Sequence, residues 1–230
     1  MKNTLFILLL LIPGILSAQD LDLVNNPYRH EDQYWLKAKV VLPFTKKFEM
    51  SAQYIGRMSL GQQFQQGHYM YVSGKYKIKK WLHVDARTRF VVDNGYNLYR
   101  LEAGLKVKQE FGDFAFSLRT AGFRENKTYL NTRDMSKAPV NYWRNRFEIS
   151  WKPSKKLSLS NSFETWNLNN NKYQFKLDKA CYIAEVSYDL NKRHEISFSY
   201  QNQFDIWQRN RISLNMYCLG YTYTFKRFSK

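Results

Sequence analysis

The chain has 230 residues, with 36 Lys and Arg against 19 Asp and Glu, so its formal net charge is +17. After the N-terminal segment no stretch is apolar for the length of a membrane-spanning helix. The mean hydropathy of −0.58 does not argue against a membrane barrel, because strands that alternate apolar and polar faces average to such values. Two distant cysteines and four scattered histidines match no disulfide framework and no metal-ligand spacing, so we expect free thiols, no metal and no cofactor.

Residues 1–18 read as a secretory signal peptide. Lys2 precedes an apolar stretch from Leu5 to Leu16, and Ser17-Ala18 form a small-residue end; a membrane-anchoring helix is the alternative. The rest, 19–230, is expected to form one outer-membrane domain. Export argues against nucleic acid as the partner of the basic charge. We expect instead outer-membrane lipids and lipopolysaccharide, with the barrel-assembly machinery during biogenesis and a monomeric mature protein.

Alternation of apolar and polar residues predicts β-strands along the whole mature chain. In residues 82–90, for example, Leu82, Val84 and Phe90 share one face, and Asp85 and Arg87 share the other. Many of these segments have ten or more residues, which suits a tilted membrane crossing. The expected strands are 33–42, 48–57, 68–79, 81–91, 97–110, 112–123, 141–152, 157–166, 174–190, 194–205 and 211–225.

Basic doublets recur just outside these strands and indicate a repeated hairpin unit. Their connections are short, whereas the others are longer and polar, as in outer-membrane barrels with short periplasmic turns. The longest expected loop, 124–140, is basic and either meets lipopolysaccharide or is simply solvated. The doublets are Lys46-Lys47, Lys79-Lys80, Lys155-Lys156, Lys192-Arg193 and Lys226-Arg227.

The fold class predicted is therefore all-β: a single antiparallel up-and-down transmembrane β-barrel. Eleven strands are clear, but a chain that enters and leaves on one side needs an even number. A short first strand at Asp20–Val24 would give twelve, which we favour, and ten is the alternative. In the last strand the apolar parity changes between Met216 and Tyr217, which predicts a bulge or a parity switch near Asn215.

Aromatic residues make up 17% of the chain and fall into two expected bands. A soluble β-sandwich or lipocalin-like protein would concentrate its aromatic side chains in mid-strand, so two bands favour membrane interfaces on the barrel exterior. The band beside the short turns comprises Phe48, Trp81, Phe114, Trp151 and Phe225. The band near the longer loops comprises Tyr96, Tyr129, Trp143, Trp166 and Trp207.

The polar faces of the strands predict a strongly charged lumen. The favoured interpretation is that a network of Arg, Lys and Glu largely fills it, giving a structural or interaction protein, because buried charges must be paired. The alternative is a small anion-selective channel or transporter, since basic residues outnumber acidic ones and Arg rings select anions. The lumen-lining candidates are Arg87, Arg89, Arg100, Arg119, Arg144, Arg146, Glu102 and Glu148.

An enzyme is the third possibility, because lipid hydrolases exist on barrels of this size. Such enzymes use a Ser/His pair, and His30 and His68 lie near expected outer loops. No His-Ser dipeptide and no Gly-x-Ser-x-Gly motif occurs. We therefore expect no catalytic residue and no enzymatic activity.

Several segments resemble a known family. The signal ends in Ala18-Gln19-Asp20, the first clear strand contains Tyr34-Trp35-Leu36, and a later strand contains Arg144-Asn145-Arg146-Phe147. The turn sequence Lys-Lys-Leu-Ser-Leu stands at 155–159, and the last strand ends Gly-Tyr-Thr-Tyr-Thr-Phe at 220–225. These features are similar to the outer-membrane barrels grouped as domain of unknown function 2490, common in Bacteroidota-type bacteria. The resemblance covers essentially the whole mature chain and implies a membrane barrel, but no catalytic or binding residue.

Overall fold

The computed structural model describes residues 29–59, 67–93, 95–129, 136–169, 175–206 and 212–227. The expected signal peptide, the expected strand at Asp20–Val24 and Trp207 lie outside these residues. The described strands are β1 (Arg29–Pro43), β2 (Phe48–Ser59), β3 (Gly67–Lys77), β4 (Leu82–Asp93), β5 (Tyr96–Phe111), β6 (Phe114–Tyr129), β7 (Ser136–Trp151), β8 (Leu157–Asn169), β9 (Lys176–Asp189), β10 (His194–Asp205) and β11 (Ile212–Thr224).

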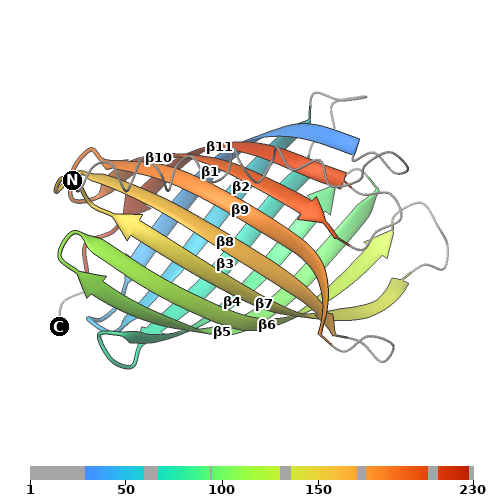
Figure 1. Ribbon diagram of the computed structural model, residues 1–230, viewed down its shortest axis with the longest axis horizontal. Helices are drawn as coiled ribbons and strands as arrows, with labels where there is room; N and C mark the ends of the chain where they lie inside the picture. The colour runs from blue at the N-terminus through green and yellow to red at the C-terminus, as the bar shows by residue number, and fades with distance from the viewer. Residues whose placement is uncertain are drawn as a thin grey trace.

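The strands form one closed barrel in sequence order (Figure 1). Consecutive strands pair antiparallel, and β1 closes the barrel by pairing parallel with β11, from Arg29↔Ile212 to Val41↔Thr224. The all-β barrel is thus confirmed, with eleven strands in the described part rather than twelve or ten. An odd number of alternating strands leaves the first and last running in the same direction, so the seam is parallel and the purely antiparallel closure is corrected.

The two faces of the wall have opposite character. Large apolar side chains on the outside are exposed, including Leu101 at 52% and Leu118 at 55%. Inward neighbours are shielded, including Glu102 at 2% and Ser117 at 6%. This distribution is the reverse of a water-soluble domain and matches strands that present an apolar surface to lipid. No helix among the described residues is long and apolar enough to cross a bilayer.

Four of the five basic doublets lie in short turns at one end of the barrel, and Lys226-Arg227 follows the end of β11. In three of these turns, the side chain before the doublet accepts hydrogen bonds from the backbone N–H groups two and three residues later. Thr45, Ser154 and Asn191 play this role. The capping closes the turn and leaves the intervening Lys and Arg side chains at the rim. In a further turn Gly112 adopts φ 59°, a conformation that favours glycine.

The expected 124–140 loop is mostly strand. β6 continues to Tyr129 and β7 begins at Ser136, because Arg124, Glu125, Lys127 and their partners extend the ladder despite their polarity. Of the bulge or parity switch expected near Asn215, the bulge is absent, since β11 pairs without interruption on both sides. Register shifts lie instead at Glu125/Lys127 and Trp166/Asn167.

The parity change in β11 has a different meaning from a bulge. Met216 and Cys218 face the lumen and are 3% and 2% exposed, whereas Tyr217 stacks on Tyr34 at a ring separation of 5.5 Å. The strand therefore carries apolar residues on both faces in its middle. Alternation cannot separate this arrangement from a bulge, because both give the same apolar pattern.

The aromatic bands are partly as expected. Trp81, Trp143 and Phe225 are exposed on the barrel surface. Trp166 and Tyr96 were expected on the outside, but both face inward: Trp166 lines a lumen cavity, and Tyr96 packs against a cluster of inward apolar side chains. This lumen cluster comprises Ile55, Tyr69, Val91 and Leu98, with Trp35 and Tyr71 beside it.

Candidate functional site

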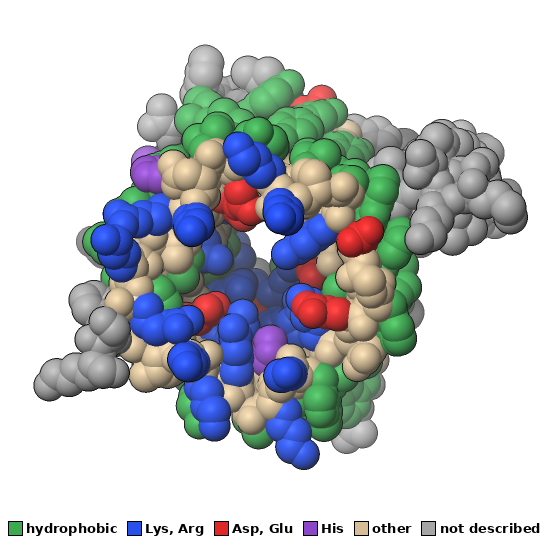
Figure 2. Space-filling model, turned by 90° about the vertical axis from the view of Figure 1, so that its left-hand side faces the viewer, with side chains coloured by type: hydrophobic (Ala, Val, Ile, Leu, Met, Phe, Trp, Pro, Cys, Tyr) green, Lys and Arg blue, Asp and Glu red, His purple; other side chains and the backbone are tan. Residues whose placement is uncertain are grey.

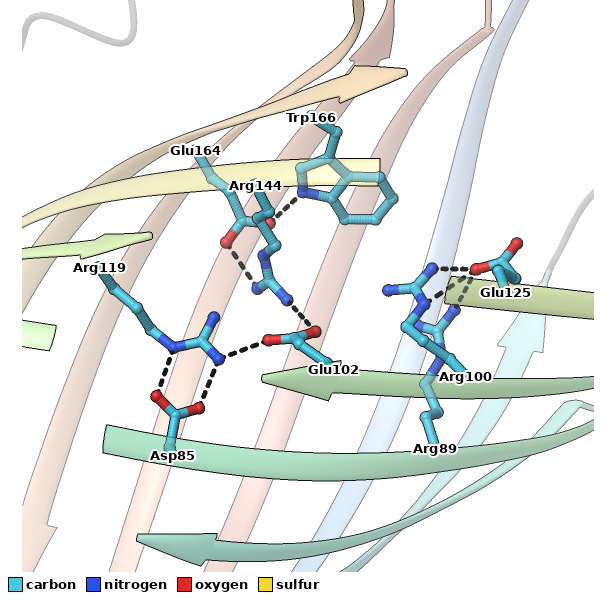
Figure 3. A network of polar contacts seen from close by, with 9 residues as sticks. All are labelled: Asp85, Arg89, Arg100, Glu102, Arg119, Glu125, Arg144, Glu164 and Trp166. Carbon is cyan, nitrogen blue, oxygen red and sulfur yellow. Dashed lines mark hydrogen bonds and ion pairs between the residues drawn. The ribbon is translucent and has the colours of Figure 1, made fainter. Parts of the chain in front are cut away.

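The wall of the lumen carries a chain of ion pairs along five consecutive strands (Figure 3). Arg119 of β6 binds both carboxylate oxygens of Asp85 of β4, at 3.0 and 2.5 Å, and donates to Glu102 of β5 at 2.5 Å. Arg144 of β7 joins Glu102 at 3.2 Å to Glu164 of β8 at 2.7 Å. We call these five residues the charged wall.

Burial explains why the carboxylates of the charged wall have to be paired. Glu102 and Glu164 are each 2% exposed, and an unpaired carboxylate at such a position would be costly. Each of the two arginines contacts two carboxylates, and the Trp166 indole N–H donates a further hydrogen bond to Glu164. The result is a continuous, mutually supported lining from β4 to β8.

A second cluster lies beside it. Arg89 and Arg100 both contact the carboxylate of Glu125, Arg89 at 3.6 Å. Arg100 lies over the Phe123 ring at 4.1 Å and near the Trp166 ring at 5.2 Å. Aromatic faces stabilise a guanidinium, so these rings and Glu125 together hold Arg100 in place.

Glycines allow the long side chains to lie flat against the wall. Arg119 reaches Asp85 over Gly104 of the intervening strand, where an added Cβ would meet Arg119 Nη2 at 3.1 Å. Arg57 reaches Asp93 at 2.5 Å across Gly67. Each crossed position needs a residue without a side chain, because the arginine occupies that space.

The other side of the lumen is lined by small residues. Ser197 and Ser199 of β10 pair in register with Gly220 and Cys218 of β11, and all four are buried. We call these four the small-residue face. Lys37 of β1 crosses Gly220, whose added Cβ would lie 2.6 Å from Lys37 Cε, and meets Glu185 of β9 at 3.7 Å.

No ion pair between described residues bridges the middle of the lumen. The pair that extends farthest, Lys37–Glu185, joins strands three positions apart around the barrel. Figure 2, which views the short-turn end, shows an opening at the centre, rimmed by Lys and Arg with Asp and Glu among them, and the line of view through it is not blocked. The network follows the wall instead of crossing the lumen.

Two cavities lie along the lumen and share one residue, Arg87. The first, about 130 Å³, adjoins the aromatic side chains Trp35, Tyr71 and Trp166. The second, about 280 Å³, lies nearer the short turns. Arg87 lines both, so it stands where the two spaces meet.

All eight predicted candidates line one of these cavities. Sequence reasoning missed the aromatic lining, and it missed the glycines that make room for long basic side chains. A glycine on a polar strand face, such as Gly104 or Gly220, was the available signal for the second feature. The first cavity holds Arg87, Arg89, Arg100, Arg144 and Glu102. The second holds Arg87, Arg119, Arg146 and Glu148.

Metal, thiol and histidine chemistry have little support in the described residues. They contain no group of three His, Cys, Asp or Glu side chains able to hold a metal ion. Cys181 and Cys218 are both free thiols, as expected. His68 bonds Tyr54 on the outer surface at 2.6 Å, and the side chain of His30 lies outside the described residues.

A closed barrel with an exposed apolar exterior and a charged lumen is a membrane β-barrel. Its fold is similar to that of a solved NanC porin, with a TM-score of 0.55 and 13% identity over 84% of this chain and 98% of that chain. A KdgM porin gives a TM-score of 0.45 at 13% identity over 75% and 83%. The same porin in complex with disordered oligogalacturonate gives 0.47 at 13% over 74% and 90%.

The family is defined by sequence. Residues 32–213 match the model of the family described as "Protein of unknown function (DUF2490)", and the chain belongs to this family. The resemblance inferred from its segments is confirmed. No curated protein matches the sequence.

Proposed function

We propose that the protein is a narrow, anion-selective passage through the outer membrane, reached by export on residues 1–18. The observation that carries the proposal is the course of the charged side chains along the wall, which leaves the centre of the lumen open (Figure 2). A lumen filled by its own network, the other interpretation of the sequence, would need pairs that cross it.

The charge of the lining supports anions over cations. Around the second cavity six side chains are basic: Lys39, Lys75, Arg87, Lys106, Arg119 and Arg146. Three are acidic: Glu49, Asp85 and Glu148. Rings of Arg and Lys select anions in pores, and this excess leaves a positive field after pairing.

The test is conductance of the purified protein in planar lipid bilayers under a KCl gradient. The expected result is a small conductance whose reversal potential indicates chloride preference, reduced in Arg87→Ala/Arg89→Ala. Silence at all voltages, with the barrel shown folded by its heat-modifiable gel mobility, would overturn the proposal and favour a structural role for the wall network.

A further inference from the structure

The second cavity contains two cations that lack the pairing found elsewhere in the lumen. Each of its three acidic side chains already forms an ion pair: Glu49 with Lys75 at 3.1 Å, Asp85 with Arg119 at 2.5 Å and Glu148 with Lys106 at 3.1 Å. Lys39 and Arg87 form no ion pair and no hydrogen bond with the described residues. The one aromatic contact of Arg87 among the described residues is with Tyr71, whose ring centroid lies 5.9 Å from the guanidinium carbon.

The carboxylate that acts on Arg87 is already saturated. Glu102 attracts Arg87 electrostatically, but its two oxygens bind Arg119 and Arg144. The positive charges of Lys37 and Arg87 act on Lys39 more strongly than the negative charges of Glu49 and Glu195. Lys39 therefore stands in a positive field, and neither Lys39 nor Arg87 has a counter-ion of its own among the described residues.

Two hydroxyl groups complete the arrangement. Ser51 of β2 and Ser73 of β3 lie in register with each other, and Ser73 lies in register with Arg87. Lys39 is two residues from Val41, the register partner of Ser51. The two hydroxyls bond each other at 2.8 Å, and all four side chains line the same cavity.

We propose that Lys39, Ser51, Ser73 and Arg87 form a binding site for a small oxyanion, with carboxylate or phosphate oxygens as the recognised group. A guanidinium and an ammonium supply charge-assisted hydrogen bonds to such oxygens, and each serine can turn its O–H outward to donate another. The cavity of about 280 Å³ holds such an ion together with water. This inference deepens the anion-passage proposal and rests on it: a passing anion pauses where Arg87 joins the two cavities.

The test measures the block of chloride current by inorganic phosphate and by acetate, together with phosphate binding to the detergent-solubilised protein by calorimetry. In the wild type both anions should reduce the current in a saturable way. Arg87→Gln and Lys39→Gln should each weaken phosphate binding by about tenfold or more, because a charge-assisted hydrogen bond contributes about 1.5–3 kcal/mol. If only phosphate or only acetate blocks the chloride current, the site is specific for phosphate oxygens or for carboxylate oxygens, respectively.

Two further variants separate the site from general lumen charge. Ser51→Ala/Ser73→Ala keeps all charges, so it should weaken phosphate binding several-fold and leave the reversal potential unchanged. Lys37→Gln removes a lumen charge that lies outside the cavity and acts on Lys39 only electrostatically. It should therefore weaken phosphate binding much less than Arg87→Gln does.

The outcomes for the site and for the passage are distinguishable. A chloride-selective current that phosphate and acetate do not affect, with no calorimetric binding, would overturn the site and leave the passage standing. Saturable binding lost in Arg87→Gln but without any current would support the site and overturn the passage. Equal loss of binding in Lys37→Gln and Arg87→Gln would also overturn the site, because only the total charge would then matter.

Discussion

The charged wall and the small-residue face of the lumen differ in how tightly their side chains are paired. The charged wall on β4–β8 packs its arginines and carboxylates at 2.5–3.2 Å. The small-residue face on β10 and β11 carries Ser, Cys and Gly, and the ion pairs beside it, Lys37–Glu185 at 3.7 Å and Lys179–Asp205 at 3.3 Å, are longer. We therefore expect that removing a partner in the charged wall lowers the free energy of unfolding more than a substitution beside the small-residue face.

The largest expected effect comes from breaking the charged wall at its centre. Glu102→Leu removes one carboxylate from both Arg119 and Arg144, and leaving buried charges without a partner is strongly destabilising. We expect a loss of about 3 kcal/mol in the free energy of unfolding, measured by urea titration in lipid vesicles with tryptophan fluorescence.

The matched control is Glu185→Leu beside the small-residue face. Its pair with Lys37 is long and Glu185 is 36% exposed, so we expect a loss below about 1 kcal/mol. Equal losses for the two variants would contradict the assignment of stability to the charged wall.

A smaller effect is expected from filling the space over which Arg119 lies. In Gly104→Ala the new Cβ would lie 2.8 Å from the Thr120 carbonyl oxygen and from Ala121 Cβ. The backbone at Thr120 cannot move aside easily. Overpacking should therefore lower the free energy of unfolding by about 1–3 kcal/mol in the same measurement. Gly122→Ala on the outer surface is the control, because its Cβ would meet only the Trp143 ring at 3.6 Å; a loss as large as in Gly104→Ala would refute the explanation.

The smallest effect on stability is expected on the small-residue face. In Gly220→Ala the crowded atoms are the side chains of Lys37 and Ser197, which can move, so we expect a cost below about 1 kcal/mol. We expect the displaced Lys37 side chain to move toward the lumen. Single-channel conductance should then fall although the free energy of unfolding hardly changes. The conductance of Gly220→Ala in bilayers is compared with that of Lys37→Gln. If Gly220→Ala leaves the conductance unchanged, the small-residue face does not set the width of the passage.

The sequence alone determined the class of fold and the two faces of most strands. Period-two alternation is a local property, so it placed Leu101 outside and Arg100 and Glu102 inside without knowledge of neighbouring strands. The doublets marked one rim for the same reason, because the turns that carry three of them are closed by a side chain one residue away. Membership of the family was also readable from short segments.

Only the tertiary structure decided how the barrel closes and how its charges meet. The parallel pairing of β1 with β11 joins the two ends of the chain. The contacts of Arg119 and Arg144 with Glu102, and the lack of a partner for Arg87 among the described residues, depend on strand stagger and on which glycine stands between two strands. Trp166 faces inward for a reason of the same kind: its indole N–H bonds Glu164 beside the buried Arg144. Such contacts join distant segments, and alternation along one strand carries no information about them.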